Sequence, residues 1–147
     1  MLIEKVIKET LELQGFRIAS FEKTTLGFLF KLVADRRYKP RCGVCGKRAI
    51  YRDTREERFF RHVPLWGIPV ILSYAPRRVI CSICGGIHIE SLPWVSGKHR
   101  LTKAFACFLA RWARLLPWAE VARMFHYAWG TVASAVKFVV GPLCHNY

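Results

Sequence analysis

The sequence predicts an α+β fold with three parts: an N-terminal helix-hairpin, a small β unit and a three-helix segment. Residues before position 40 combine one helical period with two β-rich runs. Two Cys-x-x-Cys-Gly motifs then bracket a region of alternating apolar residues, and helical spacing follows from about residue 101. We expect a division into 1–95, the helix-hairpin plus metal-binding finger, and 96–147, a helix-turn-helix segment with a tail.

The N-terminal part is predicted to be a helix followed by a β-hairpin. Apolar residues recur on one side of residues 2–14 and charged residues on the other, which indicates a short amphipathic helix. Gly15 suits the left-handed position that commonly follows a helix. The runs 16–21 and 26–33 flank a polar turn at 23–25, and this arrangement predicts two antiparallel strands.

The central region, residues 40–92, is predicted to contain a second hairpin. Residues 68–74 alternate in the period of a half-buried strand, and the run 58–63 precedes them across a short turn. Pro69 and Pro76 lack the amide hydrogen that a sheet ladder needs. We therefore expect these prolines only at a sheet edge or at a bulge.

Three helices are predicted after residue 100. Thr102 is a suitable N-cap for the first, whose inward residues are Phe105, Phe108, Leu109 and Trp112. Pro117 opens the second helix at its first turn. The third runs over residues 129–140, with Val132, Val136 and Val139 inward.

The paired cysteines predict one metal site. Cys42-Gly43-Val44-Cys45-Gly46 and Cys81-Ser82-Ile83-Cys84-Gly85 repeat one device, in which two sulfurs turn towards one ion and the following glycine lets the backbone fold back. Four thiolates suit tetrahedral zinc and leave no open coordination position, so the ion is expected to be structural. Residues 46–80 separate the pairs, longer than the usual ~15–20 residues, and the second hairpin accounts for the difference. The predicted ligands of a zinc-ribbon-like unit are Cys42, Cys45, Cys81 and Cys84.

Alternatives to structural zinc explain the cysteines less well. Four reduced core cysteines do not account for the shared Cys-x-x-Cys-Gly pattern, and a redox pair requires a βαβ unit that the sequence does not indicate. An iron–sulfur cluster stays open as a minor alternative. Cys107 is expected in the helical core, and Cys144 lies in the tail. His62 and His88 are expected to be packed or solvated histidines.

The charge balance favours a polyanionic partner. The chain has 147 residues with 24 Lys+Arg against 10 Asp+Glu, a formal net charge of +14. A membrane partner is not expected, because charges interrupt the most apolar stretch, residues 104–125, and no secretory signal pattern opens the sequence. We expect a cytoplasmic, nucleoid-associated protein in a compartment where cysteines stay reduced.

Basic residues are dense around the first cysteine pair. Eleven Lys and Arg fall between residues 31 and 61, offset by Asp35, Asp53, Glu56 and Glu57. This excess predicts a surface that contacts DNA phosphates, whereas the alternative is a solvated surface whose charges pair with the acids. The predicted phosphate contacts are Arg36, Arg37, Lys39, Arg41, Lys47, Arg48, Arg52 and Arg55.

The last two helices are spaced as in a helix-turn-helix. Residues 117–124 form the first helix, 125–128 the turn, and 129–140 the recognition helix, which enters the major groove in such proteins. The alternative is a plain three-helix bundle that closes a core. The outward residues are predicted to be Trp129, Thr131, Ala133, Ser134 and Lys137.

The order of these motifs resembles a known family. The sequence resembles the N-terminal region of DDE-type bacterial insertion-sequence transposases in the order of its motifs. These are the first knuckle, Leu65-Trp66-Gly67, the second knuckle, a Leu-Pro-Trp segment, Glu120–Phe125 and Trp129–Val132. The resemblance covers roughly residues 15–140. His126 departs from the small residue usual in that family's turn, and Gly130 stands where a basic or polar reader is common.

The resemblance implies DNA binding without catalysis. In that family the zinc finger and helix-turn-helix bind the terminal inverted repeats, and a separate RNase H-like domain with three carboxylates cuts and joins strands. The sequence holds no such carboxylate set, so we expect a truncated transposase region without strand-transfer activity that recognises element ends in double-stranded DNA. Full-length transposase or a second copy is an expected partner.

Two other functions stay open. A zinc-stapled module could dock a protein through an aromatic surface made of Trp66, Trp94 and Trp129. A zinc ribbon could also bind RNA in place of DNA.

Overall fold

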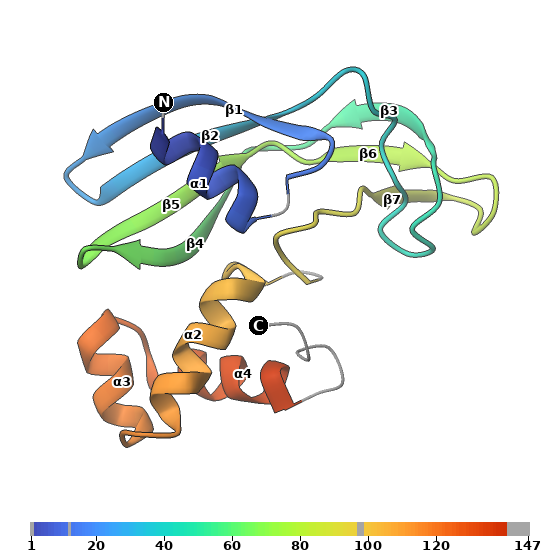
Figure 1. The fold of residues 1–147 in the computed structure, drawn as a ribbon. Helices are drawn as coiled ribbons and strands as arrows, with labels where there is room; N and C mark the ends of the chain where they lie inside the picture. The colour runs from blue at the N-terminus through green and yellow to red at the C-terminus, as the bar shows by residue number, and fades with distance from the viewer. Residues whose placement is uncertain (1, 12, 97–98, 141–147) are drawn as a thin grey trace.

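A computed structural model describes residues 2–11, 13–96 and 99–140 (Figure 1). It confirms the α+β class, with two sheets and four helices. In chain order the elements are α1 (Leu2–Thr10), β1 (Phe16–Thr24), β2 (Gly27–Ala34), β3 (Ile50–Thr54), β4 (Arg58–Leu65), β5 (Ile68–Tyr74), β6 (Arg77–Ile80), β7 (Ile87–Ile89), α2 (Lys103–Ala113), α3 (Trp118–Phe125) and α4 (Trp129–Val140).

The larger sheet joins the two predicted hairpins. Its strand order is β1-β2-β5-β4, and β2 pairs with β5 in parallel through Phe28–Lys31 and Val70–Ser73. The sequence analysis places the β4–β5 hairpin within the zinc segment. In the structure this hairpin instead belongs to the N-terminal sheet, beside β2. The reason is burial, because Phe30, Val70 and Leu72 are all 0% exposed in one shared core.

The core of this sheet lies under α1. Trp94 is 2% exposed and meets the rings of Phe16, Phe60 and Tyr74 edge-on, at centroid distances of 5.0, 5.9 and 5.4 Å. The expectation that Trp94 belongs to an aromatic docking surface is therefore wrong.

Helix α1 ends at Thr10, earlier than the predicted residue 14. Leu11 and Leu13 are both buried in the core of the larger sheet. Residues two apart point to opposite sides of a helix, so the chain has to leave the helix for both to reach one core. Gly15 has a φ of +88°, as its expected left-handed position requires.

Pro69 lies in the central strand β5 and not at an edge. The β4–β5 register shifts between His62 and Leu65, opposite Pro69, so the bulge expectation is confirmed. The carbonyl of Pro69 closely approaches Gly27, where a Cβ would lie 2.3 Å from that oxygen. Gly27 thus lets the tips of the two hairpins pack together.

Helices α2, α3 and α4 form a second layer below the sheet (Figure 1). Thr102 caps α2, because its Oγ1 accepts a hydrogen bond from Phe105 N at 3.2 Å, and it also bonds His62 Nδ1 at 2.8 Å. His126 ends α3 in the left-handed conformation, with φ 58° and ψ 45°. Among the described residues, no helix has the length and apolar character needed to cross a membrane.

Candidate metal centre and basic surface

The two cysteine knuckles fold as their sequences predict. Gly46 and Gly85 have φ angles of +71° and +72°, which return the chain after each second cysteine. Val44 N and Cys84 N donate to the sulfurs of Cys42 and Cys81, each at 3.4 Å. These backbone bonds aim the first sulfur of each pair.

The four sulfurs converge to the size of a zinc site. Their atoms all lie within 4.8 Å of one another, with Cys42–Cys84 at 3.9 Å and Cys45–Cys81 at 3.5 Å. Zn–S bonds of about 2.3 Å in a tetrahedron place sulfurs roughly 3.8 Å apart, whereas a disulfide requires about 2.05 Å. The donor set therefore fits one tetrahedral ion and contains no disulfide.

Hydrogen bonds within the cluster shift the pKa values of two of the thiols in opposite directions. A hydrogen bond from the Cys84 amide to the Cys81 sulfur lowers the pKa of Cys81 to about 6. The hydrogen bond with the Cys45 sulfur raises the pKa of Cys84 to about 12. Four adjacent thiolates repel one another, so a divalent cation is needed for all four to ionise.

The zinc unit has little core apart from its cysteines. The strands β3, β6 and β7 form its antiparallel sheet, and its buried residues are Cys42, Ala49, Val79 and Cys81. Gly43 crosses close to β7, where a Cβ would lie 2.4 Å from the Ile89 carbonyl oxygen. Metal binding and this close crossing hold together a unit that apolar burial alone cannot stabilise.

Glu90 joins the zinc unit to the larger sheet. Its carboxylate is 1% exposed, accepts a hydrogen bond from the Tyr74 hydroxyl and pairs with Arg77 at 2.7 Å. The Arg77 amide also donates to Glu90 Oε1 at 3.0 Å. Burial, together with the negative Glu90, raises the pKa of the Tyr74 phenol well above its usual value.

The predicted phosphate contacts around the zinc unit are all exposed. Lys39, Arg41 and Arg48 border a hollow of about 500 Å³ between the zinc unit and the N-terminal sheet. Arg37 is already paired, because its guanidinium binds Asp35 at 2.7 Å and lowers the pKa of that carboxyl to about 2. Asp53 similarly pairs with Arg78, whose hydrogen bonds lower the pKa of the Asp53 carboxyl. Most cations on this surface thus have no local carboxylate.

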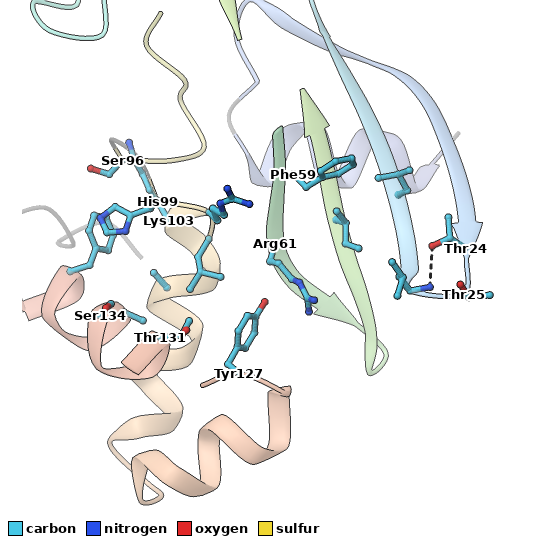
Figure 2. A pocket seen from close by; sticks show the side chains of 18 residues that line it. Thr24, Thr25, Phe59, Arg61, Ser96, His99, Lys103, Tyr127, Thr131 and Ser134 are labelled. Atoms are coloured by element: carbon cyan, nitrogen blue, oxygen red, sulfur yellow. Dashed lines mark hydrogen bonds between the residues drawn. The ribbon is translucent and has the colours of Figure 1, made fainter. Parts of the chain in front are cut away.

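The helix-turn-helix residues do not share one outward face. Ala133 is 8% exposed, so its predicted outward position is wrong, because α4 packs against both α2 and α3. Thr131 and Ser134 line a groove that faces the sheet (Figure 2). Trp129 is 56% exposed with its ring 5.6 Å from that of Trp118, and Lys137 is exposed.

The single residues outside these sets also have definite places. His62 is 3% exposed, and burial lowers its pKa to about 4. His88 Nε2 bonds the Gly85 carbonyl at 2.8 Å, and Cys107 is buried among the helices as predicted. Cys144 lies outside the described residues. Sequence reasoning missed Arg100 and Tyr127 as groove residues, because no linear pattern connects them.

Comparisons with known proteins agree with this centre. Residues 39–84 match the family model of the zinc-finger of transposase IS204/IS1001/IS1096/IS1165. The chain is 30% identical over 96 residues to a transposase for insertion sequence element IS1001 from Bordetella parapertussis. The aligned residues make up 65% of this chain and 24% of that protein. No solved structure matches. Residues 39–84 are therefore similar to the zinc finger of the insertion-sequence transposases, and the cysteine cluster within them is a structural zinc site.

Proposed function

We propose that residues 1–147 bind double-stranded DNA through the exposed cations of the zinc unit, named here the basic face. The observation that carries this proposal is an excess of exposed cations over carboxylates, since Asp35 is held by Arg37, and Asp53 by Arg78 with Arg52 at 4.0 Å. Arg37 contributes least because Asp35 offsets its charge. The basic face consists of Arg36, Lys39, Arg41, Lys47, Arg48, Arg52 and Arg55.

Zinc gives this face its shape. We propose Cys42, Cys45, Cys81 and Cys84 as the ligands, since their sulfurs meet the spacing of a tetrahedral site. Lys47 and Arg48 follow the first knuckle directly, so the fold of that knuckle sets their positions relative to β3.

Helix α4 has a smaller part in this proposal. Trp129 and Lys137 are exposed and can reach DNA, whereas Thr131 and Ser134 face the groove. Lys137 is the helix's only charge, so α4 carries few groups that read base edges. We expect affinity to come mainly from phosphates, with modest sequence preference.

The target is proposed to be the terminal inverted repeats of an insertion sequence. The relative named above is a transposase, and this chain spans about a quarter of its length. We propose that residues 1–147 contribute binding and not strand transfer, as the resemblance implies. Four of their ten carboxylates are also engaged by arginines. The ion pairs are Asp35–Arg37, Asp53–Arg78, Glu90–Arg77 and Glu120–Arg123. The DDE type, the boundary between 95 and 96, the nucleoid location and a full-length transposase partner stay predictions.

Gel shifts with an inverted-repeat duplex and a scrambled duplex test the proposal. The triple change Lys39→Gln, Arg41→Gln and Arg48→Gln should weaken binding to both duplexes and lower the salt slope by roughly 3. The control, Lys5→Gln with Lys8→Gln and Arg17→Gln, removes three exposed cations from α1 and β1. Equal losses from the two triple variants, or no duplex binding at low salt, would refute the proposal.

A protein-interaction module stays the second candidate. Trp66 is 85% exposed at the β4–β5 turn and Trp129 is 56% exposed, and large exposed rings favour partner contacts. Light scattering with and without DNA distinguishes this function, because a protein partner or second copy would add mass without nucleic acid. Competition between duplex DNA and structured RNA tests the RNA alternative.

A further inference from the structure

A groove of about 730 Å³ lies between the larger sheet and the helices (Figure 2). Leu29, Phe59 and Ile71 line its sheet wall, on the face opposite the core beneath α1. Ala135 and Phe138 of α4 line the facing wall. This volume lies within the roughly 300–1,000 Å³ of small-molecule sites, which is the size class of a nucleotide.

The charges around the groove are all positive. Arg61, Arg100 and Lys103 line it, and no Asp or Glu does. None of these three cations has an ion pair within the part of the chain that the structure describes. An anionic ligand complements such a groove.

A hydroxyl without a partner lies at one side of the groove. The Tyr127 hydroxyl is buried and makes no hydrogen bond of good geometry among the described residues. Burial raises the pKa of this phenol, and the neighbouring Arg61 guanidinium partly opposes that rise. Its ring lies 5.2 Å from the Arg61 guanidinium, and Figure 2 shows it pointing towards the sheet. A buried hydroxyl that makes no hydrogen bond costs folding free energy, which a ligand acceptor would recover.

Aromatic rings decide the class of anion. Phe59 is 51% exposed on the sheet wall although it lies within a strand, and Tyr127 and Phe138 line the same groove. A half-exposed ring beside unpaired cations suits a ligand with both a flat apolar face and a phosphate. An acidic peptide would satisfy the cations but would not need the ring.

We infer that the groove binds an unpaired nucleotide of single-stranded DNA. The base stacks on Phe59, and the phosphates lie against Arg61, Arg100 and Lys103. The inference rests on the proposed DNA binding but names a second, separate site for an unpaired strand. A paired base has its faces covered by its neighbours and cannot stack on Phe59.

The test measures fluorescence anisotropy of labelled oligo(dT) and of a labelled duplex with the full chain and zinc. Phe59→Leu keeps an apolar side chain but removes the stacking ring, so oligo(dT) affinity should fall by about fivefold or more. Tyr51→Leu is the matched control, because Tyr51 is 52% exposed on β3 of the zinc unit. Tyr127→Phe should also weaken oligo(dT) binding without lowering thermal stability, since the removed hydroxyl has no partner.

The outcomes separate the two proposals. Equal oligo(dT) affinities for Phe59→Leu and Tyr51→Leu would overturn the groove assignment and leave duplex binding intact. Binding of oligo(dT) but not of the duplex would overturn the proposed function and leave the groove site standing. Poly-glutamate binding that Phe59→Leu weakens as much as oligo(dT) binding would show a peptide site and overturn the nucleotide assignment.

Discussion

Zinc removal should unfold the zinc unit while the larger sheet persists. The strands β3, β6 and β7 order five, four and three residues. At about 1–2 kcal/mol per residue this ordering costs on the order of 12–24 kcal/mol. Burial of Ala49 and Val79 returns only about 2–4 kcal/mol, and structural zinc supplies about 10–16 kcal/mol. Without the ion, the unit lacks most of its stabilisation.

The larger sheet does not depend on the ion in this way. Thirteen buried residues form its core, including Phe30, Leu72 and Trp94. The β4–β5 hairpin belongs to this core although it lies between the cysteine pairs in sequence. Metal loss should therefore spare the hairpin and unfold the segments on either side of it.

Amide hydrogen exchange with and without a chelator measures this directly. Protection should disappear over residues 41–54 and 77–89 and persist over 16–34 and 58–74. Cys84→Ser should reproduce the chelated pattern, whereas Cys107→Ala, which changes a buried thiol outside the cluster, should retain zinc. Simultaneous loss of protection in β4 and β5 would refute the reasoning, and so would a protected zinc unit without metal.

Three further predictions concern stability. His62 is buried with a pKa near 4, below its unfolded value of 6.5, so the unfolded chain binds more protons between these values and stability falls as pH drops through this window. At saturating zinc, urea unfolding should show a loss of about 2 kcal/mol from pH 7 to pH 5 that His62→Asn removes. Glu90→Ala leaves Arg77 and the Tyr74 hydroxyl without their buried partner, so it should lower the free energy of unfolding by about 3–5 kcal/mol. A decrease below about 1 kcal/mol would contradict the role of Glu90 in joining the two sheets. Trp66 has a φ of 51° and is highly exposed, so Trp66→Asn, which suits the left-handed region, should raise the free energy of unfolding by about 1 kcal/mol; a decrease would show that Trp66 makes a stabilising contact.

Local patterns in the sequence were sufficient for the two hairpins, the helices apart from the end of α1, and the metal centre, but they did not predict β3, β6 and β7. The alternation of residues 68–74, the Thr102 cap and the two Cys-x-x-Cys-Gly motifs each depend on residues a few positions apart. The conformations of Gly46 and Gly85 follow from the same short-range chemistry. The excess of Lys and Arg around the first knuckle is likewise visible in the linear sequence.

Only the tertiary structure decided which elements share a core. Because β2 pairs with β5 in parallel, the central hairpin belongs to the larger sheet and Trp94 is buried in its core. The three-stranded sheet of the zinc unit therefore has almost no apolar core of its own. The packing of α4 likewise buried Ala133 and turned Thr131 towards the sheet. These contacts join residues far apart in the chain, and they form because they remove apolar surface from water. The periodicity of one segment shows which of its faces is apolar, but not which other segment covers that face. The sequence by itself thus determined the zinc site and its basic surroundings, whereas the groove and the division of the strands between two sheets came from packing.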